Sequence, residues 1–488
     1  MGSDWIELTI EELASPEKSS LSTGPFGSAI SAKFFQEEGV PVIRGSNLST
    51  QTSEKMNDDG LVFVSEEKAS EFKRSIVRSG DLIFTCWGTI NQVGLITEEC
   101  KYSEYIISNK QMKATLDKTK ADPLFVYYYF SSPIKQKEII QNGIGAAVPG
   151  FNLGQLKQHK LRLPSLTEQK KISSFLGLLD TKITLNRQIN QTLEQMTQTL
   201  FKSWFVDFDP VIDNALDAGN AIPDELQARA EQRQALRHAV DETNAANQPQ
   251  STRTNPAAGD ALASPYKPLP DDIRQLFPNE FEESELGWVP KGWGVGSLSD
   301  IASYTSDRVS TEDLTLSNYI STENMLVDKK GVVDAANLPT VKTVPAYVNG
   351  NVLISNIRPY FKKIWMANGR GGHSNDVLGF VTKVKYTEEY LFNLLYQDVL
   401  FDFMLATSKG SKMPRGDKKA ILNWQIVLAP ISLRTYFSNI VREFYVSASA
   451  RHKENTTLTN LRDTLLPKLI SGELRLDEVE STIAETTA

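Results

Sequence analysis

Four short landmarks occur twice, in the same order, along the 488 residues of this chain. Each set contains a tryptophan before a short apolar segment, a segment ending in an Asn and an apolar residue, a turn followed by a buried strand, and a strand that ends in proline. The matched pairs are Trp5 and Trp293, Val42–Leu48 and Tyr319–Met325, Gly80–Phe84 and Gly350–Ile354, and Leu161–Pro164 and Ile426–Pro430. Four matches in the same order would rarely arise by chance, so they predict a duplicated unit.

Each repeat continues into a long helical stretch, over about 167–204 and about 432–469. Apolar residues recur mostly three or four apart in both, the pattern of an amphipathic helix. Such a stripe needs a partner to bury it. We expect the two helices to pair as an antiparallel rod between two globular arms, with ordinary core helices of a larger bundle as the alternative. Pro467 is expected to kink or end the second helix.

The repeat predicts an α+β fold with two mixed α/β arms separated by two long antiparallel helices. Residues 203–290 hold 16 Asp/Glu and 6 Lys/Arg, which leaves the rest of the chain slightly positive although the whole carries a net charge of −8. Basic faces on the arms are therefore compatible with the acidic total. The expected boundaries are 1–165 for the first arm, 166–209 for the first helix, 210–286 for an acidic insertion and linker, 287–430 for the second arm, 431–475 for the second helix and 476–488 for an acidic tail.

Composition favours a soluble, cytoplasmic protein. No apolar run approaches the roughly 18 residues that would span a bilayer, and the first residues do not resemble a secretory signal. Cys86 and Cys100 are the only cysteines, too few for a zinc ribbon or a disulfide framework.

Motifs for catalysis are missing from the sequence. There is no Gly-x-x-x-x-Gly-Lys-Ser/Thr loop for ATP, no Asn-Pro-Pro-Tyr or Asp-Pro-Pro-Tyr of an amino-methyltransferase, and no Gly-x-Ser-x-Gly elbow. The four histidines are not at metal-ligand spacing from one another or from a cysteine. We therefore expect a chain that is not an enzyme by itself and that binds no metal or cofactor of its own.

Basic, aromatic and small polar residues gather once per arm at corresponding places. In the first arm, Gly143–Asn152 precedes Lys157, and in the second, five basic residues surround Met413-Pro414. Arg358–Lys363 matches Trp87–Gln92. Lys and Arg at loop tips suit phosphates, and Asn, Gln and Arg suit base edges. A single cluster is more often a solvated surface, but recurrence in both arms favours DNA binding.

The chain resembles the specificity subunits of type I restriction–modification systems over nearly its whole length. The most specific segments are Thr23-Gly-Pro-Phe-Gly-Ser28 followed by Gly39–Arg44, Leu200–Pro210, Phe277-Pro278 through Glu285–Gly287 with Pro290–Trp293, and Leu461–Glu473. Two departures stand out. The second arm has Tyr304–Arg308 near the place of the Gly-Pro-Phe-Gly loop, and 211–268 looks like an insertion.

The resemblance implies two target-recognition domains that each read one half of a split sequence in double-stranded DNA. It also implies that the paired helices dock two modification subunits, which hold S-adenosylmethionine and methylate adenine, and that two restriction subunits add ATP- and Mg-dependent translocation and cleavage. Together, the loops and the resemblance predict these DNA-binding residues: Gly24, Phe26, Ser28, Arg44, Asn47, Trp87, Thr89, Asn91, Gln92, Asn152, Lys157, Arg358, Tyr360, Lys362, Lys363, Lys409, Lys412, Arg415 and Lys418.

Two other classes of function stay open from the residues alone. Two arms and a rod would also serve a stand-alone sequence-specific DNA-binding regulator, and a neighbouring reading frame with an adenine-methyltransferase motif would favour the subunit. A scaffold that does not bind DNA would explain the helices but not the basic loops in both arms.

Overall fold

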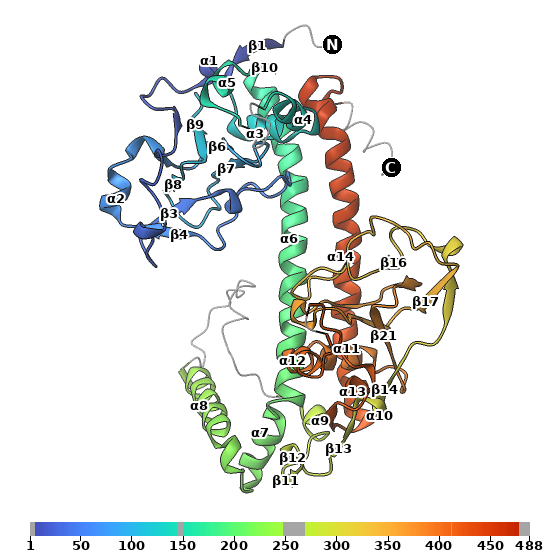
Figure 1. The fold of residues 1–488 in the computed structure, drawn as a ribbon. Coiled ribbons are helices and arrows are strands. Elements are labelled where there is room, and N and C mark those ends of the chain that lie inside the picture. Colours follow the sequence, from blue (N-terminus) through green and yellow to red (C-terminus); the bar gives the residue numbers. More distant parts are fainter. Residues whose placement is uncertain (1–4, 144–149, 247–268, 411, 478–488) are drawn as a thin grey trace. The chain divides into compact units, whose positions relative to one another are not determined.

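The computed structural model describes residues 5–143, 150–246, 269–410 and 412–477. It divides into two compact units, residues 1–189 with 451–488 and residues 190–450. The long helices α6 (Leu166–Phe205) and α14 (Ile431–Ser471) each contribute residues to both units (Figure 1).

Unit 1 contains two four-stranded sheets and one two-stranded sheet. The first sheet has the order β2-β9-β6-β7 and is antiparallel throughout, and the second has the order β4-β3-β8-β5, with β3 parallel to β8. β1 pairs with β10. The strands are β1 (Ile6–Thr9), β2 (Leu21–Thr23), β3 (Val40–Ile43), β4 (Val62–Val64), β5 (Ile76–Val77), β6 (Leu82–Thr85), β7 (Val93–Leu95), β8 (Tyr105–Ile107), β9 (Gln111–Ala114) and β10 (Lys160–Leu163).

Helices of unit 1 complete its core together with the helix pair. They are α1 (Ile10–Leu13), α2 (Glu66–Ser70), α3 (Pro123–Ser131), α4 (Pro133–Gln141) and α5 (Leu153–Gln158). α3 is buried along nearly its whole length, and its tyrosines and phenylalanines share one core with Ile172 and Leu176 of α6 and Leu466 and Leu469 of α14.

Unit 2 repeats this plan. Its first sheet has the order β14-β21-β18-β19, and β13 pairs with β22 as β1 pairs with β10. The strands are β11 (Phe281–Ser284), β12 (Gly287–Pro290), β13 (Gly294–Ser297), β14 (Ala302–Tyr304), β15 (Arg308–Ser310), β16 (Tyr319–Ile320), β17 (Thr343–Tyr347), β18 (Val352–Ser355), β19 (Ile364–Met366), β20 (Gly371–His373), β21 (Val377–Thr382) and β22 (Gln425–Leu428). The helices are α7 (Asp209–Ala218), α8 (Asp224–Ala246), α9 (Asp271–Arg274), α10 (Leu298–Ile301), α11 (Glu388–Leu395), α12 (Asp398–Ala406) and α13 (Lys418–Leu422).

The second sheets of the two units differ at one edge. Three strands correspond, because β3 is parallel and β5 antiparallel to β8, as β16 is parallel and β17 antiparallel to β20. The fourth strand is β4 beside β3 in unit 1 but β15 beside β17 in unit 2. The predicted fold class, two mixed α/β arms with two long antiparallel helices, is confirmed.

The matched turns explain why the landmarks recur. Gly80 and Gly350 have φ values of 95° and 84°, a conformation that only glycine adopts without strain. After each glycine, a side chain accepts a hydrogen bond from the backbone three residues earlier, at 2.8 Å for Asp81 and 2.9 Å for Asn351. Both turns lead into a strand, β6 and β18, in which all four residues are buried.

The long helices pair antiparallel within each unit. In unit 1, Asp180 of α6 meets Arg462 of α14 and Asn186 meets Asn455. In unit 2, Asn190 donates to the Ala448 carbonyl, and the ring centroids of Phe201 and Phe437 lie 5.7 Å apart. The partner's number on α14 falls as the number on α6 rises, so each apolar stripe finds its partner in the other helix. α14 continues past Pro467 to Ser471, since a proline in the last turn removes one backbone hydrogen bond where the helix is already ending.

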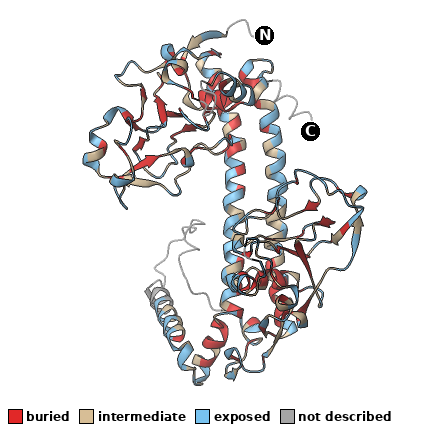
Figure 2. Cartoon of the chain, in the orientation of Figure 1, coloured by how far each residue is buried: buried red, intermediate tan, exposed pale blue. Residues whose placement is uncertain are grey.

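The segment between the repeats is structured where it is described. Val211 of α7, Ile273 of α9 and Phe277 lie in the core of unit 2. α8 is held on α7 by arginine–aspartate pairs, including Arg229–Asp209 at 2.7 Å, and presents mainly exposed or half-buried side chains (Figure 2). Residues 247–268 of the expected insertion and linker, 210–286, lie outside the described residues.

In the part of the chain that the structure describes, none of the helices combines the length and the apolar character needed to cross a membrane.

Candidate nucleic-acid interface

Three loops of unit 1 meet at one cavity of about 490 Å³. They are the turn after β3 that carries Arg44, the loop after β6 that carries Trp87, and the turn between β8 and β9. Four of the predicted DNA-binding residues line this cavity, namely Arg44, Trp87, Thr89 and Gln92. Residues distant in the sequence thus form one concave surface with both polar and aromatic character.

The Gly-Pro-Phe-Gly loop is fixed onto the β8–β9 turn. A Cβ atom on Gly24 would lie 1.9 Å from the Ser108 carbonyl oxygen, so only glycine fits there. The Asn109 amide donates to the Gly27 carbonyl at 2.8 Å. Phe26 is left 76% exposed beside Ser28, which is also exposed, and the Arg74 guanidinium lies 5.8 Å from the Phe26 ring. An aromatic ring held outward on a fixed loop can contact a partner without first becoming ordered.

The Trp87 loop is fixed in a similar way. Trp87 forms an isolated bridge with Gly150, and a Cβ atom on Gly150 would lie 2.6 Å from the indole ring. The indole is 51% exposed, Thr89 is exposed and Asn91 is half-buried. Residues 144–149 of the predicted Gly143–Asn152 cluster lie outside the described residues.

Other predicted residues of unit 1 have their polar groups engaged inside the protein. The buried Asn47 amide donates to the carbonyls of Asn57 and Asp59, each at 3.1 Å. Gln92 donates to the carbonyls of Gly45 and Leu48. Asn152 caps α5, and Lys157 pairs with Glu11 at 2.9 Å. These four side chains stabilise the loops, and Asn324 plays the part of Asn47 in unit 2.

The corresponding surface of unit 2 is built around Arg358. Ile357 bridges Arg415 as Trp87 bridges Gly150, so the Trp87 loop and the Arg358 loop are equivalent. The next residue is left-handed in both, Gly88 with φ 93° and Arg358 with φ 51°. A left-handed arginine is strained, and such strain gathers at functional positions. Arg358 and Tyr360 are both exposed.

The predicted basic residues of unit 2 differ in burial, and the partly buried ones are held by other groups of the protein. Lys362 pairs with Asp398 at 3.1 Å, and Lys363 donates to the Thr322 carbonyl at 2.7 Å. Partial burial lowers the pKa of the Lys363 ammonium. Lys412 and Lys418 are exposed, as are Lys409 and Arg415, each of which pairs with an aspartate, Asp417 at 2.6 Å and Asp376 at 3.2 Å. The exposed group is the stronger candidate for phosphate contacts.

The residues of the β8–β9 turn were not predicted from the sequence to belong to the site. Ser108, Asn109, Lys110 and Gln111 all line the cavity of unit 1. Their segment has the local pattern of a plain turn between strands. Its only signal is its polar composition directly after the buried strand β8.

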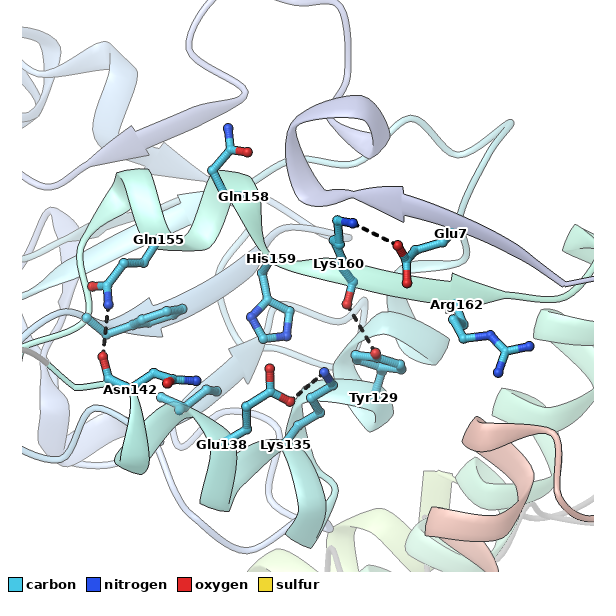
Figure 3. A pocket seen from close by; sticks show the side chains of 12 residues that line it. Glu7, Tyr129, Lys135, Glu138, Asn142, Gln155, Gln158, His159, Lys160 and Arg162 are labelled. Atoms are coloured by element: carbon cyan, nitrogen blue, oxygen red, sulfur yellow. Dashed lines mark hydrogen bonds and ion pairs between the residues drawn. The ribbon is translucent and has the colours of Figure 1, made fainter.

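A second cavity in unit 1, of about 510 Å³, lies beside α4 and β10 (Figure 3). Two of its lysines pair with two glutamates, Lys135 with Glu138 at 2.7 Å and Lys160 with Glu7 at 2.9 Å. These pairs neutralise most of its charge. His159 also lines it, and its Nε2 is buried without a hydrogen-bond partner.

Burial lowers the pKa of His159 to about 4. The folded pKa lies below the ordinary value of about 6.5, so the stabilising effect is complete above pH 6.5 and is lost as the pH falls toward 4, by about 2–3 kcal/mol. We expect His159→Leu to remove this part of the pH dependence. Urea unfolding at pH 7 and pH 4.5 measures it.

The matched control is His452→Leu, since His452 is exposed on α14. A variant at His159 that loses as much stability on acidification as the wild type would contradict the assignment.

Comparison with known proteins shows what the chain is similar to. Residues 25–195, which include the whole Trp87 cavity, match the family model described as "Type I restriction modification DNA specificity domain". This part of the chain, about a third of its length, is therefore similar to the DNA specificity domain of type I restriction–modification systems.

Two relatives match over most of the chain. The type I restriction enzyme HindI specificity subunit of Haemophilus influenzae is 25% identical over 418 residues, which cover 82% of this chain and 88% of that protein. The MjaIX specificity subunit of Methanocaldococcus jannaschii is 21% identical over 416 residues, 85% and 82% of the two chains. The crystal structure of the type I S subunit from M. genitalium has the same fold, with a TM-score of 0.53 and 14% identity over 96% of this chain and 97% of that one.

Proposed function

We propose that this chain is the sequence-specific DNA-binding subunit of a type I restriction–modification complex and that each unit reads one half of a bipartite target. One observation carries the proposal. The two units place equivalent loops, fixed by equivalent bridges at Trp87–Gly150 and Ile357–Arg415, yet the loops differ in the side chains they expose. Two unlike half-sites require the same backbone arrangement with different exposed side chains.

The exposed side chains are of two kinds, those that suit DNA phosphates and those that suit bases. Lysines at loop tips, such as Lys412 and Lys418, suit phosphates and fix position without reading sequence. Arg358 can donate two hydrogen bonds to a guanine edge in the major groove. Phe26 and Trp87 supply apolar contact to bases. We retain these residues with Ser28, Thr89, Tyr360, Lys409 and Arg415 as the DNA-contacting set.

The helix pair suits the docking of partners. α6 leaves Leu178 and Leu185 exposed in unit 1, and Leu461 of α14 is exposed in the same unit. Apolar side chains exposed along a paired helix favour protein contacts. We infer that two modification subunits dock there with S-adenosylmethionine and methylate adenine, and that two restriction subunits supply the ATP- and Mg-dependent steps.

A charge-removal experiment tests DNA binding by unit 2. Replacing Lys412, Arg415 and Lys418 with alanine together is expected to weaken DNA binding. The slope of log affinity against log salt should fall by about 0.9 for each phosphate that the variant no longer neutralises. Fluorescence anisotropy of the complex with its modification subunits, from low to high salt, measures both quantities.

The matched control removes three lysines of the same unit outside the cluster, Lys291, Lys383 and Lys385. An unaltered salt slope in the triple variant, or an equal change in the control, would argue against the proposed interface.

A further inference from the structure

The cavity at Trp87 has walls of two kinds. Ile30, Phe35 and Val42 form an apolar wall. The other wall is polar. It contains the guanidinium of Arg44 and the side-chain amides of Asn109 and Gln111. At about 490 Å³ its size is in the range of ligand pockets, roughly 300–1,000 Å³.

Two buried donors in the cavity wall lack an acceptor. Gln111 is fully buried at 0% exposure, and its Nε2 has no hydrogen-bond partner. The Nε of Arg44 is also buried and unpartnered. Gln92, in the same wall, has its Nε2 satisfied by two carbonyls. Buried donors are almost always paired in folded proteins, so two unpaired ones at one cavity indicate a missing acceptor.

Trp87 supplies a rigid aromatic edge to the cavity. Its backbone bridges Gly150, and the close approach of the indole to Gly150 limits its movement. The half-exposed ring is therefore available for stacking. An aromatic platform, an apolar wall and amide donors together are the features with which proteins hold an unstacked base.

We propose that this cavity receives one nucleobase turned out of the DNA duplex, stacked near Trp87 and hydrogen-bonded through the Gln111 and Arg44 donors. The proposal rests on the proposed function and adds to it a base read outside the helix. A phosphate would leave Ile30, Phe35 and Val42 without a role, and a base edge inside the duplex could not enter a hollow. Exposed Lys110 lies at the rim, where it can meet the displaced backbone.

In unit 2, the positions equivalent to Trp87, Lys110 and Gln111 carry other side chains. Val377 pairs with Ser355 as Gln111 pairs with Thr85, so valine replaces the glutamine. Ile357 stands in the place of Trp87. The Asp376 carbonyl accepts from Asn356 as the Lys110 carbonyl accepts from Cys86, so aspartate replaces the lysine. The extrahelical base is therefore assigned to the half-site read by unit 1 alone.

Chemical footprinting of the complex with its modification subunits tests the proposal. Permanganate and chloroacetaldehyde modify bases that have lost both their pairing partner and their stacking neighbours within the duplex. On the cognate duplex we expect one reactive base in one half-site, apart from the adenines that are methylated. Trp87→Ala and Gln111→Leu should both abolish its reactivity and weaken cognate binding about tenfold, the size of one base–aromatic stacking interaction.

The controls separate this proposal from the proposed function. Tyr386→Ala removes an exposed aromatic ring outside both DNA surfaces and should leave the reactive base unchanged. Trp87 is exposed, so its replacement does not depend on refolding of a core. Specific binding with no additional reactive base, or a reactive base that persists in both variants, would overturn the proposal. Failure of the wild-type complex to bind any specific sequence would instead contradict the proposed function.

Discussion

Replacing Asp180 with alanine is expected to destabilise unit 1 by about 3–5 kcal/mol, the usual cost of removing one partner from a buried ion pair. Asp180 of α6 is 0% exposed and accepts from Arg462 of α14 at 2.8 Å and from the Tyr128 hydroxyl at 2.6 Å. Arg462 is only 4% exposed, so the variant leaves a buried guanidinium whose remaining carboxylate partner is the exposed Asp463, at 2.7 Å. Urea unfolding followed by circular dichroism measures the loss.

The control for Asp180 is a surface pair on the same two helices. Lys182 lies 3.5 Å from Glu454, with both side chains more than 40% exposed. Exposed pairs contribute about 0–1 kcal/mol, so Lys182→Ala should change the unfolding free energy little. A loss at Asp180 no larger than that at Lys182 would show that the buried network does not stabilise the helix pair.

The equivalent network in unit 2 is neutral. From α3 onward, elements of the second repeat begin 265 residues after those of the first, as α11 at Glu388 follows α3 at Pro123 and α14 at Ile431 follows α6 at Leu166. By this offset Asn393 replaces Tyr128 and Tyr445 replaces Asp180, and the Asn393 amide donates to the Tyr445 hydroxyl at 2.9 Å. One network is charged and the other is neutral, so neither half of one network can replace a half of the other. We therefore expect the two networks to fix the register in which α6 and α14 pair.

The duplication and the helices could be predicted from the sequence because their signals extend over many residues. Apolar spacing over about 40 positions outweighs local exceptions such as Pro467, and matched turns at Gly80 and Gly350 have the same backbone requirement. The fold class follows from these two observations.

The composition of the proposed DNA surface was harder to predict because its contacts are distant in the sequence. Gly24 meets Ser108, and Trp87 meets Gly150, contacts that no local pattern encodes. The polar type of Asn47 and Gln92 suggested base recognition, but their amides bond to backbone carbonyls of nearby turns. A residue's type shows what it can bind, and only the fold shows which group is already bound.

Shortening both long helices together is expected to change the distance between the two half-sites. Removing residues 185–191 of α6 and the facing 447–453 of α14 takes away seven residues from each, about 10 Å of helix. Seven residues keep the apolar stripe within about 20° of its original direction, so the helices can still pair. With bases about 3.4 Å apart, the preferred gap should shrink by about three base pairs.

The control removes the seven residues from α6 alone, which leaves α14 with unmatched partners. We expect that variant to lose specific binding rather than to adopt a new gap, because the facing side chains no longer correspond.

The proposed function depends above all on the α6–α14 pair setting the spacing between two DNA-reading units. Mapping of methylated adenines on a library of targets that keeps both half-sites and varies the gap examines this spacing, with the complex of this chain and its modification subunits. For the doubly shortened variant we predict unchanged half-sites and a gap shorter by about three base pairs. Methylation at the original gap, or altered half-site sequences, would refute the role of the helix pair as the spacer.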